Sequence, residues 1–359
     1  MRKSKPARSS KRHNQAFRIS RSKPNGQSKH KRRRIRTAPR LSSGSLRPAY
    51  EAGSQDAASL QGGSSAIQDP DWLKRRINDS WTGRCGSRDG GQITDLLLRQ
   101  GKAYADGFTD ALRWPRQSWL PVPLDRTAAA VVLTGGKAID RGSLEELLRL
   151  PLQEIIVILR DAEGREFSQI RNVPGITIVY PGEPFGGIRS VGAKISNVDT
   201  VLFADGSKRI PAERLAILLK TVDSGADVAI SDTTASLGVF RNWDDLSRVR
   251  AFINWSLRRP ELGANSAETL PNAWSRRAIE TIGITALAIP PIAHQAAIGH
   301  DLNIAVCPNI REPKEKDGST KLSLDEHIEA LKAAMELKGS RLTLYDRVRR
   351  RSHAGGGRQ

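Results

Sequence analysis

A chain of 359 residues, 38% of them hydrophobic, is long enough to bury the core of one large domain or two small ones. Its net charge of +20 belongs to its ends: residues 1–40 carry sixteen Lys and Arg and no acid, residues 341–359 add +5, and residues 41–340 sum to −1. Two distant cysteines, Cys85 and Cys307, exclude a disulfide framework and a cysteine zinc site. No apolar run resembles a signal-peptide core or the ~18 residues of a membrane span, so we expect a soluble, cytoplasmic protein.

The first 68 residues are rich in Lys, Arg, Ser, Gly and Pro and poor in side chains that could pack, which predicts a disordered basic tail. The densest charge lies in residues 29–36. One interpretation is a salt-sensitive contact with a polyanion or an anionic surface. The other is a solvated tail, because no aromatic side chains interleave with the charges to stack on bases.

Residues 69–125 are predicted to be a helical segment that docks on a larger body. Their second helix places Leu97, Tyr104, Phe108 and Leu112 on one apolar stripe. We interpret these side chains as packing residues.

From residue 126 onward, apolar runs alternate with helix-like segments. Strands are predicted at 129–134, 154–159, 176–180, 200–204 and 227–231, and helices at 142–150, 187–195 and 211–222. Unalternating, β-branched strands in this order predict an α/β fold, a mostly parallel sheet with helices on both faces.

After residue 232 the alternation ends. Helices are predicted at 243–258, 272–282 and 291–299, a last strand at 303–307, a linker at 311–321 and a closing helix at 324–337. The expected organisation is a domain over 126–310, a linker and closing helix over 311–340, and a basic tail over 341–359.

The stretch 198–211 carries the main candidate site residue. Its apolar strand stops at Asp205, and Pro211 then opens a helix. A buried strand that ends in one carboxylate is a common way for an open α/β sheet to place a ligand-binding group beyond its strand ends. We therefore expect Asp205 in a binding crevice.

Several motifs occur in an order that resembles family 2 glycosyltransferases and their Rossmann-like GT-A fold. They are Leu-Glu-Glu-Leu-Leu at 144–148, Glu-Ile-Ile-Val-Ile at 154–158, Gly-Ile-Arg-Ser-Val-Gly-Ala-Lys at 187–194 and Val-Leu-Phe-Ala-Asp-Gly-Ser at 201–207. The resemblance covers about residues 126–310, and residues 275–283 resemble the acceptor-side segment of that family.

The resemblance implies a nucleoside diphosphate sugar as donor and a divalent metal at the family's Asp-x-Asp motif. Here the motif is Asp205-Gly206-Ser207, so a hydroxyl stands in place of the second carboxylate. Mg²⁺ or Mn²⁺ would take Asp205 and Ser207 as ligands and neutralise the charge of the departing nucleoside diphosphate. Asp161, one position beyond the place where the family reads uracil, is the expected base-binding residue.

Arg189 and Lys194 lie on the predicted helix before the Asp205 strand, where they either face a pyrophosphate or belong to a basic surface helix. The positions at which the resemblance implies a catalytic base hold no proton acceptor. His294 is then one candidate base and Asp232 a second, against packing and turn-capping roles respectively.

Three functions therefore stand side by side. The first is a hexosyltransferase with Asp205 on the metal, and the second is a catalytically silent scaffold of the same fold. The third is a polyanion-binding protein that acts through its basic N-terminus.

Overall fold

The computed structural model describes residues 46–60, 69–86, 93–134, 138–159, 165–181, 187–308, 310 and 320–343. Its strands are β1 (Ala128–Leu133), β2 (Glu154–Ile158), β3 (Thr177–Val179), β4 (Thr200–Asp205), β5 (Val228–Ser231), β6 (Asn272–Ser275) and β7 (Ile304–Cys307). Its α-helices are α1 (Arg47–Leu60), α2 (Pro70–Cys85), α3 (Asp95–Ala111), α4 (Arg141–Leu148), α5 (Arg165–Ile170), α6 (Ile188–Ile195), α7 (Ala212–Asp223), α8 (Asp245–Ser256), α9 (Arg276–Ile282), α10 (Pro290–Gly299) and α11 (Thr320–Lys338). Short 3₁₀ turns are η3 (Thr234–Ser236), η4 (Phe240–Asn242), η5 (Pro260–Leu262) and η6 (Ile284–Ala288).

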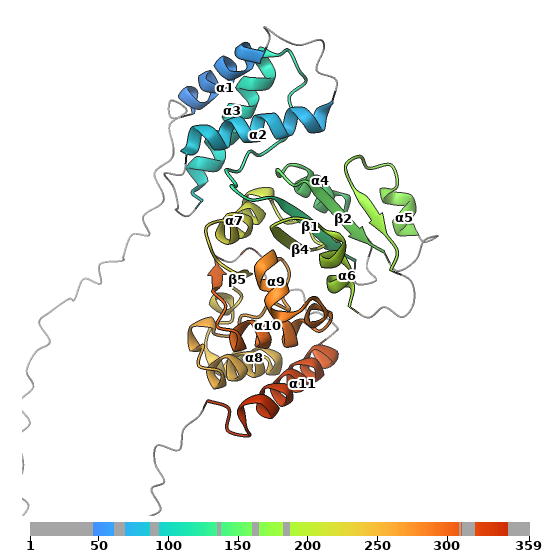
Figure 1. Cartoon of the computed structure of the whole chain (residues 1–359), viewed down its shortest axis with the longest axis vertical. Helices are drawn as coiled ribbons and strands as arrows, with labels where there is room; N and C mark the ends of the chain where they lie inside the picture. The colour runs from blue at the N-terminus through green and yellow to red at the C-terminus, as the bar shows by residue number, and fades with distance from the viewer. Residues whose placement is uncertain are drawn as a thin grey trace, which may run out of the picture. The chain divides into compact units, whose positions relative to one another are not determined.

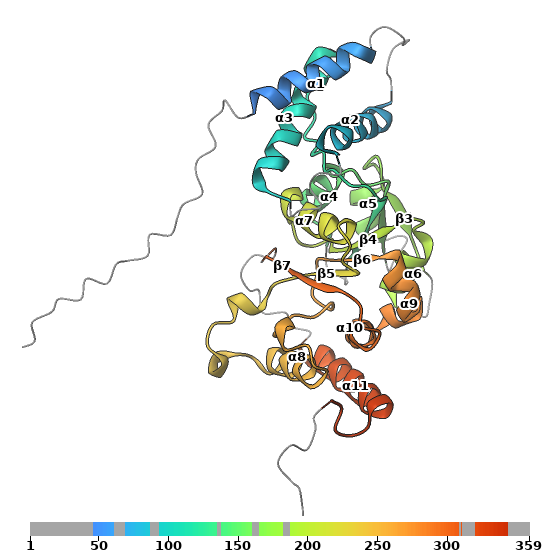
Figure 2. The same cartoon turned by 60° about the vertical axis from the view of Figure 1, so that its left-hand side comes forward.

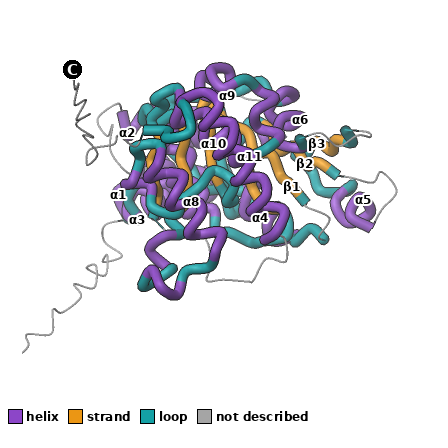
Figure 3. Tube along the Cα trace, turned by 90° about the horizontal axis from the view of Figure 1, so that it is seen from below, coloured by secondary structure: helices purple, strands orange, loops and turns teal. Residues whose placement is uncertain are grey.

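The strands form one sheet in the order β3-β2-β1-β4-β6-β5-β7. Figure 3 shows strands of this sheet in orange, with β3, β2 and β1 labelled on one side. All pairs are parallel except those of β6, which runs antiparallel to β4 and to β5. The predicted α/β class, a mostly parallel sheet covered on both faces, is confirmed. Parallel strands need crossover connections, and the helices between them supply these.

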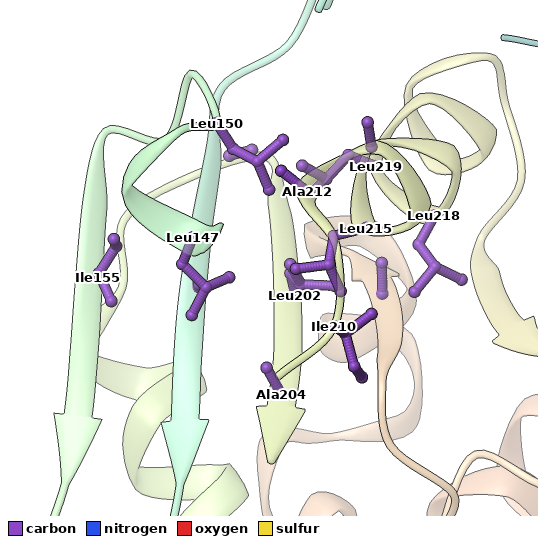
Figure 4. Close-up of a cluster of buried hydrophobic side chains, with 14 of the residues drawn as sticks. Leu147, Leu150, Ile155, Leu202, Ala204, Ile210, Ala212, Leu215, Leu218 and Leu219 are labelled. Carbon is purple, nitrogen blue, oxygen red and sulfur yellow. The ribbon is translucent and has the colours of Figure 1, made fainter. Parts of the chain in front are cut away.

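Alternate residues of each central strand pack into two different cores. In β1, Ala128, Ala130 and Val132 join the core under α4 and α7. In Figure 4, Leu147 of α4 lies over β1, and Leu215 of α7 lies beside Leu202 of β4. Ala129, Val131 and Leu133 join the second core, with side chains from α6, α8, α9, α10 and α11. Both faces of β1 are therefore buried, which explains its unalternating apolar sequence.

The segment 232–271 is a long excursion between two neighbouring strands. It leaves the carboxyl end of β5, contains η3, η4, α8 and η5, and returns at Asn272 of β6. Within it, α8 packs against α11, and the two helices lie side by side (Figures 1 and 2). Because both ends of the excursion adjoin the carboxyl ends of the parallel strands, its turns border the predicted binding edge.

The predicted helix over residues 272–282 is wrong in its first part. Asn272–Ser275 form the antiparallel strand β6, and α9 begins only at Arg276, with Ser275 as its N-cap. Ser275 does cap the helix, since its hydroxyl accepts from the amide of Ala278. The residues before it form a strand because they pair with β4 and β5 on either side. A short helix, α5, also stands between β2 and β3, where none was predicted.

The predicted disorder of residues 1–68 is wrong for Arg47–Leu60, which form α1. This helix packs along α3 so closely that Gly53 and Gly107 meet the backbone of the other helix. Tyr104 and Phe108 of the predicted apolar stripe are buried in this three-helix cluster, together with Leu73, Ile77 and Trp81 of α2. Residues 1–45, 61–68, 311–319 and 344–359 lie outside the described residues.

Candidate functional site

The predicted binding edge is the carboxyl end of the central strands. Asp205 is the last residue of β4 and lies in register with Leu133 of β1. The carboxylate is half-buried, and the preceding four residues of its strand are fully buried. A charged side chain therefore stands at the point where the apolar sheet ends, as the sequence predicted.

The turn after Asp205 is held by its own carboxylate. Oδ1 accepts hydrogen bonds from the backbone amide of Ser207 at 2.9 Å and from its hydroxyl at 2.7 Å. Oδ2 lies 3.4 Å from Nζ of Lys208. The structure thus brings Asp205 and Ser207 together, and it adds a cation, Lys208, that the motif comparison did not single out.

Gly206 locks this turn onto the neighbouring strand. A Cβ atom at this position would stand 2.8 Å from Val132 Cγ1, so no side chain fits. The Gly206 carbonyl accepts from the amide of Asp140 at 2.9 Å and from the hydroxyl of Ser143 at 2.8 Å. The position of the Asp205 carboxylate is therefore fixed by the start of α4 as well as by β4.

Asp232 lies at the same level of the sheet, two strands away. Phe203 of β4 and Ile230 of β5 both pair with Asn272 of β6, and Asp205 and Asp232 each follow two residues later. Two strand spacings place the two residues about 10 Å apart.

The Asp232 carboxylate organises the turn that begins the excursion. Its Oδ1 accepts from the amide of Thr234 at 3.0 Å and from the side-chain amide of Asn265 at 3.1 Å. Asn265 in turn accepts from the amides of Thr233 and Thr234. Asp232 therefore caps this turn through Oδ1, and its side chain remains partly exposed at the edge.

His294 is placed in the core, with both ring nitrogens engaged. Asn254 uses its amide group to donate to two backbone carbonyls, so its Oδ1 is an acceptor, and His294 Nε2, 2.9 Å away, must donate to it. Nδ1 then accepts from the amide of Ala267 at 3.4 Å. Burial lowers the pKa of His294 to about 3. With its lone pair occupied and its ring enclosed, His294 is not positioned to take a proton from an acceptor, and the packing alternative describes it.

Arg189 lies in the first turn of α6 but points into the protein. Its guanidinium donates to the carbonyls of Ala267 at 2.7 Å and Glu268 at 2.6 Å, and it stands 5.8 Å from the ring centre of Phe203. Burial lowers its pKa to about 10. The side chain fastens the excursion to α6, which is a structural role different from the predicted contact with a pyrophosphate.

Lys194 is at the wrong end of its helix for donor binding. Because α6 leads into β4, its last turn lies near the amino end of that strand, where Arg276 donates to the carbonyls of Ala193 and Ser196. Strand β4 spans five residue steps, roughly 17 Å, between this end and Asp205. Lys194 is exposed there, as in the surface-helix alternative. The remaining donor-binding prediction, Asp161, lies outside the described residues, as do residues 135–137 after β1.

The donor set at Asp205 bears on the metal that the resemblance implies. Within the described ranges, no three His, Cys, Asp or Glu side chains are grouped so that they could hold a metal ion. One carboxylate is nevertheless what a magnesium-type site commonly takes from a protein when phosphates of a substrate supply further oxygens. Asp205 and Ser207 fit a cation that arrives with such a ligand, and they do not fit a cation held by protein groups alone.

A buried charge cluster around Glu268 was not anticipated from the sequence. Its carboxylate pairs with Arg250 of α8 and accepts from the hydroxyl of Ser323 of α11, and His327 Nε2 lies at 3.6 Å. Burial raises the pKa of Glu268, but the charges of Arg250 and His327 outweigh it and hold the pKa below its usual value. Nothing in the local sequence sets Glu268 apart, since its partners come from helices 18 and 55 residues away.

A cavity of about 350 Å³ lies at the opposite, amino-terminal edge of the sheet. It is bordered by α2 and by the first residues of β1 and β2, among them Lys74, Asn78, Thr127 and Glu154. Lys74 donates to the carbonyl of Leu148 at 2.6 Å, and burial lowers its pKa to about 8. Acidic and basic side chains are mixed in the lining, so the cavity favours no one class of ligand.

No protein-family model matches the chain, and no curated protein sequence matches it. Among solved structures, it is similar to mannosyl-3-phosphoglycerate synthase from Rubrobacter xylanophilus, with 15% identity, 63% of this chain and 78% of that chain covered, and a TM-score of 0.44. It is similar to a mannosyltransferase from Pyrobaculum calidifontis solved with GDP-Man and Mn²⁺, with 16% identity, coverages of 73% and 76%, and a TM-score of 0.41. It is also similar to 4-diphosphocytidyl-2C-methyl-D-erythritol synthase from Anaerococcus prevotii, with 13% identity, coverages of 57% and 96%, and a TM-score of 0.36. Each of these TM-scores is below 0.5, and the fold described above follows from the strand order and pairing.

Proposed function

We propose that this chain binds a nucleoside diphosphate sugar at the carboxyl edge of the sheet and transfers the sugar to an acceptor. The observation that carries the proposal is the position of Asp205, a half-buried carboxylate at the end of the central strand β4, fixed by the turn through Gly206 and Ser207. Such an edge is where open α/β sheets bind ligands.

In this proposal Asp205 and Ser207 contact Mg²⁺ or Mn²⁺ brought by the diphosphate, and Asp161 lies near the nucleobase. The metal would supply positive charge for the departing nucleoside diphosphate. Lys208, with its ammonium 3.4 Å from Asp205 Oδ2, offers a second source of positive charge at the same place. Among the described candidates, Asp232 is the carboxylate left to act as base on the acceptor hydroxyl.

Titration calorimetry of the full chain with UDP and with GDP, in Mn²⁺ and in EDTA, tests donor binding. We expect Asp205→Asn to weaken the binding of the preferred nucleotide by at least about tenfold, because a charge-assisted contact is lost. Asp199→Asn is the matched control: Asp199 precedes the same strand at its other end and accepts from Thr127. Absence of binding of both nucleotides, or equal affinities of the two variants, would refute the donor site.

A catalytically silent scaffold of the same fold is the second candidate. It is favoured by one observation: His294, a candidate base, has both ring nitrogens engaged. Nucleotide binding that depends on Asp205, without release of sugar from a panel of UDP and GDP sugars, would support the scaffold. Sugar release that Asp232→Asn abolishes while nucleotide affinity is kept would support the transferase.

A further inference from the structure

The outer face of α8 carries an unusual concentration of exposed apolar side chains. Of the ten large hydrophobic side chains most exposed among the described residues, four lie between Val239 and Trp255. They are Val239 (58% exposed), Phe240 (62%), Phe252 (48%) and Trp255 (53%). Exposed apolar groups scattered singly are ordinary, but a gathering of this kind marks an interaction surface.

Two of these side chains, Phe252 and Trp255, lie on α8, and Val239 and Phe240 come from the η4 turn that is fastened to the same face. Arg248, Phe252 and Trp255 follow one another at steps of four and three residues, which places them on one face of α8. Phe240, from η4, lies over Arg248, with the guanidinium carbon 5.9 Å from the ring centre. Arg248 also donates to the carbonyl of Arg241 at 3.0 Å, which fastens η4 to the helix. We call Val239, Phe240, Arg248, Phe252 and Trp255 the α8 strip.

The opposite face of α8 is already occupied. Ile253 and Leu257 pack in the second core, and Arg250 pairs with Glu268 beneath it. The strip is therefore not a core-facing surface. It is the solvent face of a helix whose other face is fully used.

Arginine is in small excess around the strip, where Arg248 also pairs with Asp245 at 3.0 Å and Arg259 pairs with Glu261. Apart from the buried Arg250, residues 239–259 contain four arginines and two aspartates. The chain leaves α11 beside the end of the strip, because Thr343 donates from its amide to the carbonyl of Ser256 at 3.4 Å. Beyond that anchor, residues 344–359 add five arginines and one acid.

We propose that the α8 strip docks on the surface of an anionic lipid bilayer. A helix with aromatic and aliphatic side chains on one face and arginines along it lies in the headgroup region, with its apolar face against the acyl chains. Trp and Arg suit this position, because each joins an apolar body to a polar end. The arginines beyond Thr343 would add attraction to anionic headgroups.

The composition of the strip favours a bilayer over a nucleic acid. Single-stranded nucleic acids stack their bases on aromatic rings, and Val239, among the most exposed members, has no ring. A bilayer accepts aliphatic and aromatic groups alike. Within the described parts of the chain, none of the helices has both the length and the apolar character that crossing a membrane requires. The proposed docking is a contact with the bilayer surface.

Flotation of the full chain with vesicles of phosphatidylcholine, with and without phosphatidylglycerol, tests the proposal. We expect binding to the anionic vesicles, and we expect Phe252→Ser with Trp255→Ser to weaken it by at least about tenfold. The matched control is Trp72→Ser on α2, a tryptophan that is 42% exposed away from the strip, which should change the affinity by less than about twofold. Unchanged thermal midpoints of the variants would show that both remain folded.

Fluorescence quenching distinguishes insertion of the α8 strip into the bilayer from adsorption of the protein through its basic tails. With phosphatidylcholine brominated on its acyl chains added to the anionic vesicles, quenching should fall in Trp255→Phe and stay unchanged in Trp72→Phe. Equal quenching in these two variants, or undiminished vesicle binding of the double variant, would overturn the proposal. So would loss of RNA binding or of self-association in the double variant while vesicle binding persists, since the strip would then serve a nucleic acid or a second copy.

Discussion

Asp205 stands between two kinds of positive charge, an ammonium group that the protein supplies and a metal ion that a ligand would bring. Lys208 is three residues away and lies 3.4 Å from Oδ2, the oxygen that Ser207 leaves unused. If a diphosphate binds at this edge as proposed, a cation of either kind would balance the charge of the carboxylate beside it. Which one dominates decides whether nucleotide binding requires metal.

We expect Lys208→Gln to make nucleotide binding more dependent on metal. In EDTA the variant should bind UDP or GDP at least about fivefold more weakly than the parent chain, while in Mn²⁺ the two should differ by less than about twofold. Calorimetry under both conditions measures the ratio. Lys102→Gln is the matched control, since Lys102 faces Asp106 across the same 3.4 Å on a distant helix. A Lys208→Gln variant that loses affinity equally with and without metal would contradict this view of Asp205.

Glu268 is the residue whose loss should cost the most stability. Its carboxylate forms an ion pair with Arg250, and both side chains are less than one-fifth exposed. Glu268→Gln would leave that guanidinium buried without a counter-ion, and we expect a loss of roughly 3 kcal/mol in the free energy of unfolding. Urea denaturation measures it. Glu261→Gln removes a more exposed pairing with Arg259 and should change stability by less than about 0.5 kcal/mol.

Because His294 is buried and neutral, we expect the protein to lose stability in mild acid. Its pKa is about 3 in the folded protein, below the usual value near 6.5, so the unfolded chain binds a proton between these values that the folded chain does not. The stability that neutral His294 contributes is fully present above pH 6.5 and declines as the pH falls toward 3. About 2 kcal/mol of the free energy of unfolding is lost by pH 5. Burial lowers the pKa of His327 as well, which adds to the same trend.

The slope of unfolding free energy against pH, measured from 7 to 5, is the appropriate readout. His294→Gln should lower the absolute stability and flatten that slope. His300→Gln, at the exposed end of α10, should leave the slope as it is. A parent chain and a His294→Gln variant with equal slopes would refute the assignment of a buried, neutral His294.

Which site residues could be placed from the sequence depended on the direction in which the chain runs through each element. Asp205 was predictable because the end of an apolar strand marks the sheet edge by itself. Lys194 was misplaced because its helix runs back to the start of β4, and Arg189 because its partners, the carbonyls of Ala267 and Glu268, arrive from nearly eighty residues away. Such contacts leave no local pattern, and they separate a buried anchor from an anion-binding residue.

At the level of elements, the contact between α1 and α3 depends on two glycines. A Cβ atom on Gly53 would stand 2.1 Å from the carbonyl oxygen of Tyr104, and one on Gly107 would stand 2.1 Å from that of Tyr50. We expect Gly53→Ala or Gly107→Ala to separate the helices and cost about 2 kcal/mol or more in local stability. Hydrogen exchange of peptides from α1 and α3 measures that loss independently of the sheet.

Gly83 supplies the control for this prediction. It lies in α2 with no atom within 4 Å of an added Cβ, so Gly83→Ala should leave exchange unchanged or slow it, by up to about 1 kcal/mol of helix propensity. Faster exchange in all three variants would indicate a general effect of substitution and not a close helix contact.

The elements themselves divide into those that the sequence could predict and those that it could not. The central parallel strands β1 and β4 could be recognised because each is an apolar run buried on both faces. Strand β6 has only four residues, includes Asn272, and runs directly into a helix, so its strand character comes from β4 and β5 on either side. Helix α1 was missed because its buried face is made of Ala49, Gly53 and Ala57, small residues that give little apolar signal.

At the scale of the whole molecule, charge is concentrated outside the sheet domain. Deleting residues 1–40 removes sixteen positive charges and leaves a net charge of +4. We expect this deletion to keep the thermal midpoint and to weaken heparin binding at low salt by at least about a hundredfold, with a shallower salt dependence. Deleting residues 352–359, which removes one arginine, is the control. Equal heparin affinities of the two truncated chains would leave residues 1–40 as a solvated tail.

The antiparallel direction of β6 determines where the excursion begins and ends, and so how freely its length can vary. Residues 232 and 271, at the ends of the excursion, adjoin neighbouring strands and so stand about one strand spacing, 5 Å, apart. A loop closed at its base in this way can change length at little entropic cost, because the cost grows only with the logarithm of its length. The half of the sheet that ends at Asp205 is built from other segments. A change in the excursion would thus alter the edge at Asp232 and the α8 strip together, while the Asp205 turn stays unchanged.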